Sequence, residues 1–119
     1  MDLSVIVPIC NELLNVEELY CRIRQELQKL SLTYEVIFID DGSTDGTTEK
    51  IIDMARNESQ LNVIIFSRNY GQTEAMVAGF QFARGDFIVT MDGDLQNDPA
   101  DIIRIIIKLQ SGYDMVCGW

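Results

Sequence analysis

Five short apolar runs, each rich in β-branched residues, recur along the chain and are separated by longer segments with helical periodicity. The runs are continuous rather than alternating, which is typical of parallel strands covered on both faces. Regular alternation of strands and helices predicts right-handed crossovers. We therefore expect an α/β fold with a doubly wound, mainly parallel five-stranded sheet and helices on both faces. The expected strands are Leu3–Val7, Glu35–Ile39, Asn62–Phe66, Asp86–Met91 and Tyr113–Cys117.

The segments between the runs have the spacing and the end signals of helices. The second expected helix spans 47–57, and the third spans 72–83 with Gly85 behind it as a predicted left-handed cap. The fourth, 98–112, begins with an Asp-Pro pair and ends at a glycine, which are start and stop signals. The first carries an apolar stripe that consists of Val16, Leu19, Tyr20, Ile23, Leu27 and Leu30.

Composition excludes several classes of function. The 119 residues suffice for one domain with its own core, and their net charge of −10 argues against a nucleic-acid partner. The absence of histidine excludes Ser-His-Asp and Cys-His mechanisms and histidine-containing zinc sites. Neither an apolar run of about 18 residues nor a basic leader is visible. Three separated cysteines predict reduced thiols and a cytoplasmic setting, and they are Cys10, Cys21 and Cys117.

Polar residues follow four of the runs, at the sheet edge where parallel α/β sheets bind ligands. Neighbouring carboxylates there repel each other by about 1 to 4 kcal/mol per pair at 4 Å, a cost that a divalent cation removes. Asp92 and Asp94, with a glycine between them, form an oxygen site suited to Mg²⁺ or Mn²⁺. Phosphate oxygens fill the open positions of such an ion, so we expect a diphosphate ligand with Arg68 as the nearby cation.

The same residues also have structural interpretations. Ser43, Thr44 and Asp45 are equally consistent with simple helix capping. Asn11 and Glu12 could merely begin the first helix, and an arginine alone is more often a solvated charge than a phosphate ligand. The functional interpretation is favoured because four polar clusters fall at the one edge where this fold binds ligands.

Other ligand-binding patterns do not fit. An EF-hand loop that started at Asp41 or Asp92 would need a glutamate in its twelfth position, where the chain has Ile52 or Ile103. The chain contains neither a phosphate-binding G-x-x-x-x-G-K-[ST] loop nor the dinucleotide fingerprint G-x-G-x-x-G. A phosphate-accepting receiver domain would need acids after the first strand and a lysine after the fifth, and those places hold other residues.

Four motifs in order along the chain resemble family 2 glycosyltransferases of the GT-A fold. Within that family the sequence is most similar to polyprenyl-phosphate sugar transferases of the dolichol-phosphate mannose synthase and bactoprenol glucosyltransferase type. The resemblance covers essentially the whole chain, 1–119, but only the nucleotide-binding part of the family's catalytic domain. The motifs are Val7-Pro8-x-Cys10-Asn11-Glu12, Ile39-Asp40-Asp41-Gly42-Ser43, Ser67-Arg68-Asn69-x-Gly71 and Met91-Asp92-Gly93-Asp94-Leu95-Gln96.

The resemblance implies a role for residues of the first three motifs. The first nucleotide-contacting loop of the family is matched by Pro8, Asn11 and Glu12, and Cys10 stands where a tyrosine is more usual. Asp41, with Asp40, matches the acid that reads the base or the ribose. The family's loop near the nucleotide is matched by Arg68 and Gly71.

The fourth motif implies the metal site. Asp92 and Gly93 match donor-binding residues of the D-x-D motif. Asp94 and Gln96, with Asp92, match the ligands of a Mg²⁺ or Mn²⁺ ion that holds the diphosphate. Such an ion, together with an arginine, neutralises the charge that builds on the leaving group as the glycosidic bond breaks.

The resemblance therefore implies metal-dependent transfer of a sugar from a UDP- or GDP-sugar to a dolichyl or undecaprenyl phosphate, at the cytoplasmic face of a membrane. The catalytic base is expected beyond residue 119, so we expect 1–119 to be a donor-binding fragment that is inactive alone and prone to self-association. Two alternatives stay open: a soluble family 2 transferase that acts on a glycan, and a non-catalytic nucleotide-binding or interaction module.

Overall fold

The computed structural model describes residues 1–91, which form four strands and three helices. The strands are β1 (Leu3–Ile9), β2 (Tyr34–Asp40), β3 (Leu61–Ile65) and β4 (Phe87–Thr90). The helices are α1 (Val16–Gln28), α2 (Thr47–Asn57) and α3 (Gln72–Phe82). The fifth expected strand and the fourth expected helix, 98–112, lie outside the described residues.

The four strands form one sheet in the order β3-β2-β1-β4, and every neighbouring pair is parallel. Val5 of β1 lies opposite Val36 of β2 on one side and Val89 of β4 on the other. Within residues 1–91 the pairing with β4 extends to Ile6, and Pro8 lies opposite Ile39 of β2. The expected doubly wound parallel sheet is confirmed, with four strands in the described part of the chain.

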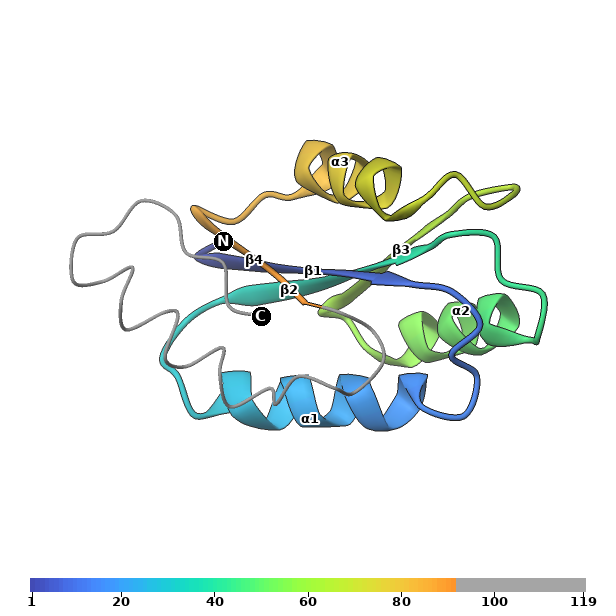
Figure 1. Cartoon of the computed structure of the whole chain (residues 1–119). Coiled ribbons are helices and arrows are strands. Elements are labelled where there is room, and N and C mark those ends of the chain that lie inside the picture. The colour runs from blue at the N-terminus through green and yellow to red at the C-terminus, as the bar shows by residue number, and fades with distance from the viewer. Residues whose placement is uncertain (92–119) are drawn as a thin grey trace.

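Helices cover both faces of the sheet (Figure 1). The chain moves from β1 through β2 to β3 in one direction, and α1 and α2 lie together on one face. It then returns across β2 and β1 to reach β4, and α3 lies on the opposite face. This arrangement follows from right-handed crossovers, because reversing the direction of travel moves the connecting helix to the other face.

The larger core lies between the sheet and α1. Five of the six residues of the predicted stripe are buried, whereas Leu30 lies beyond the end of α1 and is only partly buried. Tyr20 meets Phe38 of β2 edge to face, with ring centroids 6.1 Å apart. The fully buried side chains of this core include Val5, Val7, Val36, Phe38, Leu19 and Ile23.

Helix α3 has small residues toward the sheet and large apolar residues toward solvent. Ala75 and Gly79 are buried, and a Cβ at Gly79 would lie 2.5 Å from the Cγ2 atom of Ile6. The glycine is therefore what allows the helix to lie this close to β1. On the outer side Val77, Phe80 and Phe82 are each almost half exposed.

The predicted role of Gly85 as a left-handed cap is wrong. Helix α3 ends at Phe82 and its C-cap residue, Ala83, is extended, whereas the glycines with positive φ in residues 1–91 are Gly42, Gly46 and Gly71. Gly85 is required for a different reason, because a Cβ there would lie 2.5 Å from the backbone nitrogen of Ser4. The chain passes directly over β1 at this point.

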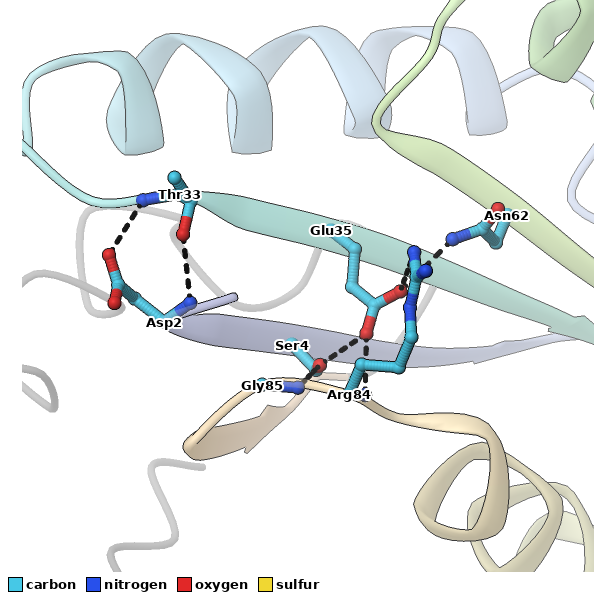
Figure 2. A network of polar contacts seen from close by, with 7 residues as sticks. All are labelled: Asp2, Ser4, Thr33, Glu35, Asn62, Arg84 and Gly85. Carbon is cyan, nitrogen blue, oxygen red and sulfur yellow. Dashed lines mark hydrogen bonds and ion pairs between the residues drawn. The ribbon is translucent and has the colours of Figure 1, made fainter.

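A buried carboxylate holds that passage in place (Figure 2). The side chain of Glu35, on β2, is 1% exposed. It accepts hydrogen bonds from the Ser4 hydroxyl at 2.6 Å, the Arg84 backbone N–H at 2.7 Å and the Asn62 side-chain amide at 3.0 Å. The Gly85 N–H in turn donates to the Ser4 hydroxyl oxygen at 2.8 Å. The connection from α3 to β4 is thus bonded directly to β1 and β2, and Glu35 links it to Asn62 of β3.

The hydrogen bonds decide the ionisation of this carboxyl group. Burial alone would raise the pKa of Glu35, but the bonds from Ser4 and Arg84 and the Arg84 charge lower it below its ordinary value. Arg84 Nη2 lies 3.5 Å from the carboxylate, so the buried charge has an ionic partner. The ionised form is therefore the one that stabilises the fold.

We expect Glu35→Gln to lower the free energy of unfolding by about 1 to 3 kcal/mol at neutral pH, because an amide replaces a charged acceptor of three donors. A group whose pKa is lowered on folding stabilises the fold above its unfolded pKa and less as the pH falls. The difference between wild type and variant should therefore shrink below about pH 4.5. Denaturant titrations at several pH values from 7 to 3 measure this difference in the free energy of unfolding.

Glu18→Gln is the matched control, because Glu18 forms an exposed pair with Arg22 on one helix face. Its effect should stay within about 0.5 kcal/mol. Equal effects of the two substitutions at pH 7 would contradict the role given to Glu35.

Candidate active site

The loops after β1, β2 and β3 lie together at the carboxyl edge of the sheet, at the right of Figure 1. This is the edge at which open parallel sheets bind ligands. The predicted donor-binding residues up to Gly71 lie in these loops, apart from Pro8 and Asp40, which lie at the ends of β1 and β2. Their side chains and main chains contact one another through hydrogen bonds that link all three loops.

Asn11 joins the first loop to the second. Its backbone N–H donates to the Ser43 hydroxyl at 2.9 Å, and its side-chain oxygen accepts the Thr44 N–H at 2.8 Å. Asn11 has a φ of 55°, a left-handed conformation that asparagine tolerates better than most residues. The first loop is therefore shaped by its contacts with the second.

Asp45 ties the same two loops together a few residues further on. Its carboxylate accepts the backbone N–H of Leu13 at 3.2 Å and that of Thr47, the first residue of α2, at 3.0 Å. The hydrogen bond from the Thr47 hydroxyl is the main reason that the pKa of Asp45 is lowered. The Glu12 N–H donates to that hydroxyl at 3.0 Å. Asp45 therefore satisfies the first amide of α2 from the position before the N-cap residue, Gly46.

The two consecutive acids after β2 are both buried and both engaged. Asp40 accepts the Ser43 N–H at 3.0 Å and a hydrogen bond from the Thr48 hydroxyl, so it shapes its own loop. The Asp41 carboxylate, on a residue only 6% exposed, accepts the N–H groups of Tyr70 at 2.7 Å and Gly71 at 3.0 Å. Asp41 thus fixes the start of α3.

The carbonyl oxygen of Asp41 completes the link among the three loops. It accepts hydrogen bonds from the Cys10 thiol at 3.3 Å and from the Asn69 side-chain amide at 3.2 Å. In the structure the side chain and the main chain of Asp41 bond to the neighbouring loops, and its predicted contact with the ligand stays a prediction. Each loop is held in place through this one residue.

Gly42 brings the second and third loops into backbone contact. Its φ is 74°, and a Cβ there would lie 2.4 Å from the carbonyl carbon of Arg68 and from the backbone nitrogen of Asn69. Both the conformation and the contact require glycine.

Arg68 extends from this contact with its guanidinium above the ring of Tyr70, its Cζ 4.9 Å from the ring centroid. Within residues 1–91 Arg68 forms no ion pair. Tyr70 also meets Phe66 edge to face at 5.6 Å. Sequence reasoning missed Tyr70, although an aromatic residue two positions after the predicted phosphate ligand is a signal that could have identified it.

The predicted metal ligands lie outside the described residues: Asp92, Asp94 and Gln96, together with Gly93. In the part of the chain that the structure describes, no three cysteine or acidic side chains gather into a possible metal site. Asp40 and Asp41 are also occupied as hydrogen-bond acceptors. Two carboxylates and an amide oxygen are ligands that suit Mg²⁺ or Mn²⁺, so the residues of the fourth motif fit such an ion.

The fold and these linked strand-end loops define an α/β protein with a candidate ligand site at the carboxyl edge of its sheet. Comparison with known proteins identifies the class: the chain belongs to glycosyl transferase family 2, whose profile matches residues 4–119. The chain is 46% identical over 114 residues to the undecaprenyl-phosphate 4-deoxy-4-formamido-L-arabinose transferase of Aeromonas hydrophila. It is 37% identical over 116 residues to an uncharacterized glycosyltransferase of Synechocystis.

Solved structures show the same fold. A mannosyltransferase of Pyrobaculum calidifontis, in complex with GDP-Man and Mn²⁺, superposes with a TM-score of 0.75 at 27% identity, over 89% of this chain and 31% of that one. Residues 1–349 of Staphylococcus aureus TarS, in complex with UDP-GlcNAc, give 0.70 at 26% identity, over 93% and 32%. These likenesses confirm the expected GT-A fold.

The chain spans about a third of the length of its curated relatives. The alignment with the Aeromonas protein includes 95% of this chain and 35% of that protein. The alignment with the Synechocystis protein includes 98% of this chain and 36% of that protein. Within residues 1–91, each helix falls short of the length and apolar character needed to cross a bilayer.

We expect Gly42→Ala to destabilise the chain by about 1 to 3 kcal/mol more than Gly46→Ala, because only the former adds an overlap with the neighbouring backbone. Gly46 also has a positive φ, 99°, but a Cβ there meets only the Leu13 side chain, at 3.4 Å. Both variants share the cost of a left-handed alanine. Urea unfolding measures both, and equal losses would contradict the close contact between the loops.

Proposed function

We propose that the protein to which this chain belongs transfers a sugar from a UDP- or GDP-sugar to a polyprenyl phosphate, dolichyl or undecaprenyl, at the cytoplasmic face of a membrane. Residues 1–119 form its donor-binding part in this proposal. The observation that carries it is the 46% identity to a relative named as an undecaprenyl-phosphate transferase, which extends over 95% of this chain. The family match and the solved neighbours in complex with GDP-Man or UDP-GlcNAc support a nucleotide-sugar donor.

The donor is proposed to lie against the linked loops at the carboxyl edge of the sheet. Pro8, Asn11 and Glu12 would border it on the side of β1, with Asp41 beneath the nucleoside. Arg68 is exposed and without an ion pair in residues 1–91, and an arginine in that state suits phosphate oxygens. Because the loops are already bonded to one another, little ordering is left for the donor to impose.

The diphosphate of the donor needs more positive charge than Arg68 alone supplies, since the chain is strongly acidic. Asp94 and Gln96, with Asp92, would hold a Mg²⁺ or Mn²⁺ ion there. When bound, such an ion stabilises the negative charge of the departing diphosphate.

The reaction forms a bond between a phosphate oxygen of the acceptor and C1 of the sugar. The bond from C1 to the nucleotide's phosphate oxygen breaks, and the nucleoside diphosphate leaves with its electron pair. A polyprenyl phosphate is ionised at neutral pH, so its oxygen needs orientation more than deprotonation. The group that orients it is expected beyond residue 119.

We expect UDP or GDP to bind more tightly with Mn²⁺ than without it, and Asp94→Asn to weaken the Mn²⁺-dependent affinity by about tenfold or more. The same substitution should leave the metal-free stability equal or slightly higher, because it removes a like charge. Isothermal titration calorimetry and thermal unfolding measure the two effects.

Asp86→Asn is the matched control, since Asp86 is an exposed acid that directly precedes β4, eight positions before Asp94 in the sequence. It should change neither measurement. A metal-free chain destabilised by Asp94→Asn, with Mn²⁺-dependent affinity intact, would make Asp94 structural. No binding of either nucleotide by wild type would favour the non-catalytic interaction module.

For the full-length protein, we expect radiolabel from a sugar nucleotide to enter the organic phase with polyprenyl phosphate. Asp94→Asn should abolish most of this transfer, and Asp86→Asn should preserve it. Label that appears only in an offered glycan would contradict the lipid acceptor and support the soluble family 2 transferase instead.

A further inference from the structure

We propose that Tyr70 is a positioning residue, which holds the guanidinium of Arg68 where the phosphates of the donor bind. The inference rests on the proposed function, because it concerns the same donor site. It begins from the stacked pair itself: the Arg68 Cζ lies 4.9 Å from the centroid of the Tyr70 ring. A cation at this distance from an aromatic face is attracted by the ring quadrupole.

The Tyr70 ring is itself held from two directions, although the residue is 49% exposed. Its backbone N–H donates to the buried Asp41 carboxylate at 2.7 Å. Its ring meets that of Phe66 edge to face, with centroids 5.6 Å apart and planes at 89°. Phe66 packs against the apolar cluster beneath α3, so the aromatic pair is anchored to the core.

The backbone of Arg68 is equally restricted. Its carbonyl carbon lies so close to Gly42 that a Cβ there would be 2.4 Å away, and the neighbouring Asn69 is bonded to the Asp41 carbonyl. The main chain and the end of the side chain are thus both fixed. The flexible methylene groups between them are what the ring restrains.

Stacking suits an arginine that must bind phosphate. The ring takes one face of the planar guanidinium, and the N–H groups around its edge stay available to oxygen atoms. Within residues 1–91 no carboxylate pairs with Arg68, so nothing in that part of the chain competes for those donors. An arginine already held near its binding conformation loses less rotamer freedom when the ligand arrives.

The test is a double-mutant cycle on the chain with Mn²⁺ present, using Tyr70→Ala, Arg68→Ala and the double variant. Affinities for the preferred nucleoside diphosphate come from calorimetry, and those for the matching nucleoside come from ligand-observed NMR. We expect Tyr70→Ala to lower the affinity for the nucleoside diphosphate about 2- to 5-fold, which corresponds to the strength of an exposed cation–π contact. It should leave the nucleoside affinity unchanged and should have no further effect once Arg68 is alanine.

Tyr70→Phe is the conservative variant, because it keeps the ring and removes only the hydroxyl. It should bind the diphosphate within about twofold of wild type. Tyr70→Leu, which keeps apolar bulk against Phe66 without an aromatic face, should resemble Tyr70→Ala. Thermal unfolding of each variant establishes that it is folded.

The possible results separate this inference from the function on which it rests. Wild type that binds neither UDP nor GDP would overturn the proposed function. Wild-type binding that Tyr70→Ala leaves unchanged would overturn only the positioning role. The positioning role would also be overturned if Tyr70→Ala still lowered the affinity for the diphosphate in the Arg68→Ala background. The same holds if it lowered the affinity for the nucleoside equally, because the ring would then act on the base or on the fold.

Discussion

The position of α3 depends on two buried carboxylates, those of Glu35 in β2 and of Asp41, the residue that directly follows β2. Alternate residues of a strand share a face, and on the face beneath α3 these are Glu35, Ile37, Ile39 and Asp41. Asp41 accepts the N–H groups just before the helix, and Glu35 accepts the Arg84 N–H just after it. Six residues of strand span roughly 20 Å and an eleven-residue helix about 16 Å, so the two lengths match.

Holding α3 at both ends places two segments that matter for the site. Before the helix, the Asp41 bonds set the loop that carries Arg68 and Tyr70. After it, the Glu35 network sets where β4 begins, and the residues that follow β4 carry the D-x-D motif. In the middle, Ala75 and Gly79 let the helix approach the sheet closely. The acids at the two ends of β2 therefore fix how the loop of Arg68 and Tyr70 and the start of β4 are placed relative to each other.

The sequence predicted the four described strands to within two residues at each end, and α2 with its bounds, because apolar periodicity and capping report local structure directly. Contacts between residues far apart in the sequence could not be predicted from such local patterns. Glu35 at the start of an apolar run looks like a solvated acid until Ser4, Asn62 and Arg84 are brought around it. Gly85 was assigned to a left-handed turn because close approach and positive φ both select glycine. The site residues beyond Met91 stay predictions.

The same carboxylates bear on where phosphate can bind. The N-terminus of a helix is an anion site, since its free N–H groups and its dipole favour negative charge. Beside the N-terminus of α3 a carboxylate of the protein is already present, because Asp41 accepts the Tyr70 and Gly71 N–H groups just before the first helical residue. A diphosphate there would meet the negative charge of this buried carboxylate. In the proposed function its charge must be balanced beside α3 instead, by Arg68 and by a cation at the D-x-D motif.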